Sequence, residues 1–105
     1  MSETSRRQKL EAMLAGDAGD PFLRYGLAME YASGGDHEAA VQQFRVLMQS
    51  PKKYVPAYLM AAQSLQKLGR TPEAIAALKE GIVVAKKQGD LHAAGEMEGM
   101  LDSLE

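Results

Sequence analysis

Residues 26–44 read GLAMEYASGGDHEAAVQQF, and this stretch decides the fold. Apolar residues recur at helical spacing on both sides of a Gly34-Gly35-Asp36 break. A glycine followed by an aspartate is typical of one helix that ends in a left-handed cap and another that begins at an N-cap. Alanines on both sides of the break would let the two helices pack closely. The stretch therefore predicts a helical hairpin, which occurs either once or as one copy of a repeat.

Residues that start and end helices divide the whole chain. Glycines at positions 16, 35, 69 and 89 follow apolar-periodic runs, where left-handed caps would require them. The expected N-caps are Asp20 and Thr71 before prolines, Asp36, Asp90, and Ser5 in a capping box with Gln8. Val55-Pro56 starts a helix without a good cap. The predicted helices cover residues 5–15, 21–33, 37–49, 55–68, 72–87 and 91–104.

A period of 34 residues relates the two central hairpins. The matching pairs are Gly35 and Gly69, Ala28 and Ala62, Tyr31 and Leu65, Ala40 and Ala74, Phe44 and Leu78, and Met48 and Ile82. One period earlier, the first helix has the pattern of the second helix of a pair. One period later, Glu96 and Gly99 occupy packing positions, so the register fails. The last helix has its own apolar stripe of Leu91, Ala94, Met97, Leu101 and Leu104.

This helix–turn–helix period resembles the tetratricopeptide repeat. The first copy matches at Leu27, Ala28, Tyr31, Gly35, Ala40, Phe44 and Pro51, and the second at Tyr58, Ala62, Leu65, Gly69, Ala74 and Leu78. The chain departs from the family at Arg24, where an aromatic residue is usual, and at Leu47 and Gly81, where alanine is usual. The segment DPFLRYGLAMEY also resembles small uncharacterised bacterial proteins of this family.

The resemblance implies an all-α superhelix, a solenoid of two helix–turn–helix repeats flanked by one helix at each end. The expected parts are a flanking helix at about 5–15, repeats at about 20–53 and 54–88, and a capping helix at about 90–105. Because neither hairpin can bury its apolar face alone, we expect residues 1–105 to form a single domain.

Composition argues against several classes of partner. The net charge is −2 and there is no cysteine, so no disulfide or zinc–thiolate site is expected. The basic pairs at 6–7, 52–53 and 86–87 are short and separated, so we expect them to be solvated and predict no nucleic-acid partner. Neither a signal peptide nor a run of roughly 20 apolar residues is present, which favours a cytoplasmic protein without membrane contacts.

The sequence contains no recognisable catalytic or metal-binding pattern. The two histidines, His37 and His92, fall in different predicted helices, and we expect both to be exposed in a first turn. The serines have no evident histidine or aspartate partners, and neither glycine-rich phosphate-binding pattern occurs. We therefore predict a protein that is not an enzyme and has no cofactor and no metal site.

The resemblance also implies where a partner would bind, because the first helix of each hairpin lines a concave face in this family. The corresponding positions are Phe22, Tyr25, Met29, Ala32, Leu59, Met60, Gln63 and Gln66. They form an apolar, methionine-rich surface that suits an adaptable binding groove. Alternatively, the last helix folds across this face and buries it as core. The two-carboxylate clamp of some family members is absent, since its positions hold Tyr25, Met29, Leu59-Met60 and Ala94.

We therefore expect a non-catalytic protein–protein interaction module, or scaffold, that binds a helix or an extended segment of a partner protein in this groove. The alternative is structural self-association, in which a homodimer forms through the same face.

Overall fold

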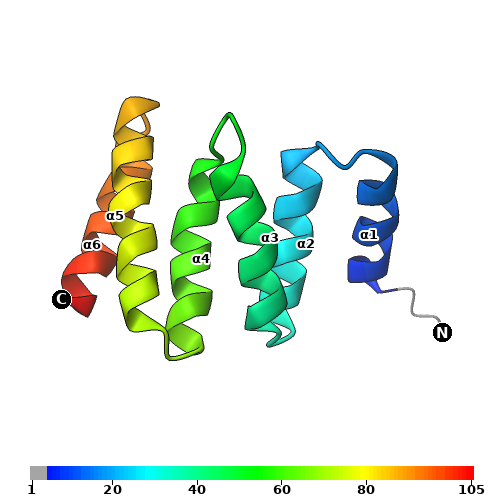
Figure 1. Ribbon diagram of the computed structural model, residues 1–105, viewed down its shortest axis with the longest axis horizontal. Coiled ribbons are helices and arrows are strands. Elements are labelled where there is room, and N and C mark those ends of the chain that lie inside the picture. The colour runs from blue at the N-terminus through cyan, green and yellow to red at the C-terminus, as the bar shows by residue number, and fades with distance from the viewer. Residues whose placement is uncertain (1–4) are drawn as a thin grey trace.

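The computed structural model describes residues 5–105, which form six α-helices and no strand (Figure 1). The helices are α1 (Arg6–Gly16), α2 (Pro21–Ser33), α3 (His37–Gln49), α4 (Val55–Lys67), α5 (Thr71–Lys87) and α6 (Leu91–Leu104). They follow one another along the longest axis of a molecule that measures 44 × 28 × 19 Å. The predicted helices agree with these bounds to within one residue. Residues 1–4, which the expected domain includes, lie outside the described residues.

Each helix packs against its neighbours in the chain, and α4 also contacts α2 and α6. The helices α2 and α3 form one hairpin, and α4 and α5 form a second. This arrangement is the all-α helical superhelix that the 34-residue period predicts. The first helix of each hairpin therefore lies beside the first helix of the next, and together they form one face of the molecule.

Three of the turns are built in the same way. Gly35, Gly69 and Gly89 have φ angles of 86°, 76° and 79°. After each glycine, a backbone N–H reaches back over the helix end, from Asp36 to the Tyr31 carbonyl at 2.9 Å and from Asp90 to the Ala85 carbonyl at 2.8 Å. This 6→1 hydrogen bond, together with the left-handed glycine, defines the Schellman motif. The α5–α6 turn thus has the same construction as the turns inside the two hairpins.

The predicted caps are confirmed with two exceptions. Ser5 and Gln8 form a capping box, and the side chains of Asp20, Asp36 and Asp90 accept hydrogen bonds from first-turn N–H groups. Gly16 was predicted wrongly as a left-handed cap. It lies inside α1, which ends at Asp17 through a bond from its N–H to the Leu14 carbonyl (3.1 Å). Thr71 was also predicted wrongly, since it is the first helical residue and Arg70 precedes it without a side-chain cap.

The small residues pack where the repeat pattern predicts. Ala28 and Ala40 belong to one buried cluster with Phe44, and all three are fully buried. Ala62 and Ala74 occupy the same positions in the second hairpin and belong to a second cluster with Leu78. Small side chains at these contacts allow two helix backbones to approach closely. A third cluster joins Leu10 and Leu14 of α1 to Leu27 of α2.

The helix α6 packs against α5 and α4, with Ala94 and Met97 buried. The repeat register fails there for a structural reason. The helix α5 is 17 residues long where its counterpart α3 has 13, and α6 begins directly after the Gly89 turn. The apolar stripe predicted for α6 is therefore displaced, and Leu91, its first predicted member, is wrong as a packing residue because it is 69% exposed.

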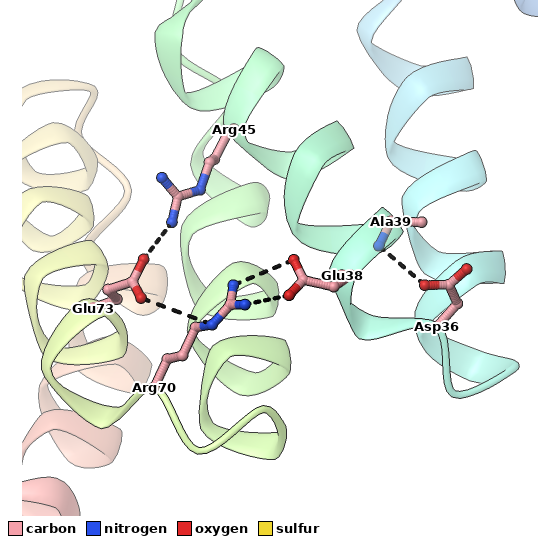
Figure 2. A network of polar contacts seen from close by, with 6 residues as sticks. All are labelled: Asp36, Glu38, Ala39, Arg45, Arg70 and Glu73. Carbon is pink, nitrogen blue, oxygen red and sulfur yellow. Dashed lines mark hydrogen bonds and ion pairs between the residues drawn. The ribbon is translucent and has the colours of Figure 1, made fainter.

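Ion pairs join α3 to the start of α5 (Figure 2). The Arg45 guanidinium lies 2.8 Å from the Glu73 carboxylate, and Arg70 pairs with both Glu38 and Glu73. All four side chains are between 40% and 53% exposed. Such exposed pairs contribute about 0–1 kcal/mol each. The relative placement of the two hairpins is therefore stabilised mainly by the apolar clusters, with a small contribution from the ion pairs.

Candidate partner-binding face

The face formed by α2, α4 and α6, hereafter the groove face, contains two neighbouring pockets. The first has a volume of about 250 Å³ and lies between the three helices. Tyr25, Leu59 and Met60 line it together with Ala93 and Met97 of α6. The second has a volume of about 300 Å³ and is lined by Met29, Ala32, Met60 and Gln63, among others. Met60 contributes to both pockets, so they adjoin.

The structure brings together six of the eight residues predicted for the groove, including Ala32 at the second pocket. Tyr25, Met29, Leu59 and Met60 are half-buried, and Gln63 is exposed at the second pocket. The other two, Phe22 and Gln66, line neither pocket, and Phe22 is 73% exposed near the start of α2. The half-buried members also pack against the core clusters, so each of them has both a structural and a surface role.

The position of Tyr25 depends on two other rings. Its ring centroid lies 5.9 Å from that of Phe44 and 5.3 Å from that of Tyr54, with both pairs tilted. Tilted aromatic pairs at these separations are favourable. Burial and, to a smaller extent, the neighbouring Tyr54 raise the pKa of the Tyr25 hydroxyl. Sequence reasoning missed Tyr54, and the available indication was an aromatic residue directly before the Val55-Pro56 helix start.

The helix α6 forms a wall of the first pocket. It packs against α4 and α5, while among the described residues no Cα atom of α6 lies within 8 Å of one in α2. The N-cap residue Asp90 and the α6 residues His92 and Glu96 give the pocket a polar border, and His92 Nε2 lies 3.7 Å from Glu96 Oε1. Sequence reasoning did not assign these residues to the groove, because the 34-residue register does not extend into α6.

Two polar residues meet at the second pocket. His37 Nδ1 lies 3.0 Å from Ser64 Oγ, and Ser64 is only 2% exposed. The predictions that His37 is exposed and that the serines lack a histidine partner were therefore wrong. The 34-residue period compares equivalent positions, and it does not show which side chains of α3 and α4 meet. A partner for the buried hydroxyl removes the cost of leaving it unsatisfied.

The His37–Ser64 pair lacks other parts of a catalytic site. No carboxylate hydrogen-bonds to the His37 ring within residues 5–105. A serine nucleophile needs an oriented base and N–H groups directed at a developing oxyanion. Ser64 instead lies inside α4. Across the same residues, no group of three histidine, cysteine, aspartate or glutamate side chains could hold a metal ion.

Comparison with known proteins shows which structures this chain resembles. No protein-family model matches the chain, and no curated protein matches it. A Bordetella parapertussis protein of known solution structure superimposes with a TM-score of 0.82 at 27% identity, over 97% of this chain and 89% of that protein. A tetratricopeptide repeat domain protein from Salinibacter ruber superimposes with a TM-score of 0.77 at 30% identity, over 83% of this chain and 88% of that chain. The chain belongs to the tetratricopeptide repeat family.

A crystal structure of a tetratricopeptide repeat domain protein from the same organism agrees, with a TM-score of 0.75 at 29% identity over 81% of this chain and 94% of that one. Tetratricopeptide domains of this fold are typically non-catalytic, and membership supports a protein-interaction module as the general class of function. No helix within residues 5–105 is long and apolar enough to cross a membrane.

Two departures from the tetratricopeptide pattern have a structural explanation. Arg24, at a usual aromatic position, donates from Nη1 to Gln43 Oε1 at 2.7 Å and from Nη2 to the Ala18 carbonyl at 3.0 Å. It thereby joins α2 to α3 and to the α1–α2 connection. Gly81 allows α4 and α6 to approach α5, because a Cβ atom there would lie 2.6 Å from both Tyr58 Cβ and Met97 Sδ.

Proposed function

We propose that the groove face binds an apolar segment of another protein, either a helix or an extended chain. The observation that supports this is the pair of adjoining pockets, of about 250 and 300 Å³, that share Met60. Pockets of this size suit single side chains of a ligand, and two neighbouring pockets suit two anchor residues of one segment. The corresponding function is that of a non-catalytic adaptor. We infer that it acts in the cytoplasm and that the whole chain forms one domain.

The chemistry of the lining supports a protein ligand over a small polar molecule. Tyr25, Leu59, Met60 and Met29 supply apolar surface from two helices. Methionine side chains are flexible and polarizable, so they adjust to ligand side chains of different shape. The exposed amide of Gln63 and the polar residues of α6 lie beside this surface, where they can bond to the ligand backbone. An apolar centre with a polar border is typical of protein interfaces.

Two glutamines provide a matched test. Gln63 is exposed at the second pocket, whereas Gln42 is exposed on α3 and lines neither pocket. Changing either to glutamate adds one charge with almost no change in shape. At Gln63 the new charge would lose water against a bound apolar ligand, which weakens binding. We expect Gln63→Glu to capture about tenfold less partner than Gln42→Glu, as measured by quantitative mass spectrometry after pull-down.

Photo-crosslinking locates the contact independently. A photoreactive amino acid at Phe22 or Gln66, three residues from Tyr25 and from Gln63 respectively, should crosslink to the same partner segment, while one at Gln42 should not. Equal capture by the two glutamate variants, with crosslinks only at Gln42, would place the binding site away from the groove face.

Homodimer formation through the same face is the second candidate, supported by the exposed Phe22, which precedes Tyr25 by three residues in α2. Light scattering over a concentration series separates the two. A protein that remains monomeric favours the adaptor. A dimer that Gln63→Glu dissociates and Gln42→Glu does not favours self-association.

A further inference from the structure

One edge of the molecule gathers its exposed apolar side chains. The connections α1–α2, α3–α4 and α5–α6 all lie along this edge, at the top of Figure 1. We call it the loop edge, and it comprises residues 17–20, 50–54 and 88–90 with the adjoining helix turns. Every large hydrophobic side chain that is exposed among the described residues belongs to a helix turn at or near this edge, namely Met13, Phe22, Val46, Val83 and Leu91.

The loop edge has two hollows that meet at Pro51 and Lys52. The larger, of about 760 Å³, lies between the α3–α4 connection and the last turns of α5, with Val83 in its wall. The smaller, of about 400 Å³, lies between the α1–α2 connection and the end of α3, with Val46 in its wall. Val83 is 57% exposed and Val46 is 46% exposed. Neither hollow shares a lining residue with the pockets of the groove face.

Basic side chains surround these apolar walls. Lys52, Lys53 and Lys87 line the larger hollow, and Arg24 and Lys52 line the smaller. Within the described part of the chain, none of these four lies within ion-pairing distance of a carboxylate. By contrast, Lys79 and Lys86 of α5 pair with carboxylates of α6.

The two carboxylates in the hollows already have partners. Asp20 Oδ1 accepts a hydrogen bond from the N–H of Phe22 at 2.9 Å, which caps α2. Glu80 accepts from the Tyr58 hydroxyl at 3.3 Å. The two hollows are thus lined by four basic and two acidic side chains, an excess of positive charge on a chain whose net charge is −2.

We propose that the loop edge is a second docking surface and that its occupant is an acidic segment of another protein with apolar side chains. Lys52 and Lys87, which have no ion-pair partner among the described residues, would attract carboxylates of the segment. The hollows beside Val46 and Val83 would hold its apolar side chains. Charge complementarity of this kind steers encounter and fixes register. A nucleic acid fits less well, because no aromatic ring lines either hollow to stack against a base.

The probe for this surface is a fluorescein-labelled synthetic peptide of glutamates with a leucine at every third position. Binding to the intact protein is measured by fluorescence anisotropy at low and at high salt. We expect Lys52→Glu and Lys87→Glu each to weaken binding, by about tenfold or more when combined, and Val83→Ser to weaken it as well. Lys9→Glu in α1 is the control for a single charge reversal, because Lys9 lines neither hollow, and it should leave binding within about twofold.

Several outcomes would overturn the proposal. One is the absence of saturable binding at low salt. Others are an equal loss with Lys9→Glu and with Lys52→Glu, or an unchanged affinity when the leucines of the peptide are replaced by serine, since either indicates attraction by net charge alone. Tighter binding of a labelled single-stranded oligonucleotide, or dissociation by the peptide of a homodimer formed through this edge, would assign a different occupant. Loss of binding in Gln63→Glu would place the peptide on the groove face instead.

Discussion

At the scale of single residues, Gly81 shows how one missing side chain permits a close approach. A Cβ atom at this position would lie 2.6 Å from Tyr58 Cβ and from Met97 Sδ. The methionine end can move, but Tyr58 Cβ is fixed by the backbone of α4. Glycine inside a helix costs about 1 kcal/mol relative to alanine. The close packing of α4 and α6 against α5 offsets that cost.

Gly81→Ala should therefore destabilise the protein, although alanine is the better helix former. Overpacking of a close core contact costs about 1–3 kcal/mol, which outweighs the gain in helix propensity. Gly95→Ala in α6 is the matched control, because Gly95 is exposed and its Cβ would meet nothing within 4 Å. It should stabilise the protein by about 1 kcal/mol. Denaturant unfolding of both variants checks these opposite signs, and a gain in stability for Gly81→Ala would contradict the packing account.

Tyr58 is a single residue that makes the free energy of unfolding depend on pH. Its side chain is fully buried, and its hydroxyl donates to the Met48 carbonyl at 3.0 Å or to Glu80 at 3.3 Å. Burial, followed by the charge of Glu80 and the hydrogen bond to it, raises the pKa of Tyr58 from 10.0 to about 12. The folded state therefore holds this proton more tightly than the unfolded state does.

Because the folded pKa is the higher one, the resulting stabilisation is fully present below pH 10 and is lost as the pH rises toward about 12. We expect the free energy of unfolding to fall over this window. Tyr58→Phe should be less stable at neutral pH, since the hydrogen bonds are lost, and should show a shallower decline above pH 10. Urea unfolding at a series of pH values tests this, and identical slopes for both proteins would contradict it.

At the scale of elements, local sequence was enough to place the helices. Gly35 and Gly69 adopt the left-handed conformation expected of glycines that follow apolar-periodic runs, and the small alanines lie at the predicted contacts. Gly16 was mistaken for a similar cap because a glycine after an apolar run has the same local pattern. What separates the two cases is the tertiary path of the chain into α2, which a local pattern does not contain.

The candidate site was less predictable than the helices. The repeat register assigned Tyr25, Met29, Leu59 and Met60 to one face, and in the structure they line two adjoining pockets. It could not assign the α6 wall, because α5 is longer than α3 and shifts everything after it. It also could not show that His37 meets Ser64, since that contact depends on how α3 and α4 sit against each other.

At the scale of the whole molecule, residues 5–105 have no single central core. Apolar clusters follow one another along the molecule, from Leu10 and Leu14 in α1 to Ala94 and Met97 in α6. Residues such as Met48 and Tyr31 pack against two clusters each and so connect neighbouring ones. In a solenoid, each unit is stabilised mainly by its immediate neighbours. Cooperative unfolding then depends on whether these connections couple the two ends.

We predict that they do, so that the described chain unfolds as one unit. Leu10→Ala and Met97→Ala remove well-buried side chains, 6% and 1% exposed, from opposite ends, and each should cost about 2–5 kcal/mol. Circular dichroism reports all helices, whereas tyrosine fluorescence reports mainly the central residues 25–58. In one cooperative unit, the unfolding midpoints from both probes shift together in each variant. In the double variant the two losses of unfolding free energy add, because the two sites share no partner. If Met97→Ala instead lowers only part of the dichroism signal while fluorescence keeps its original midpoint, α6 unfolds separately and the single-domain prediction fails.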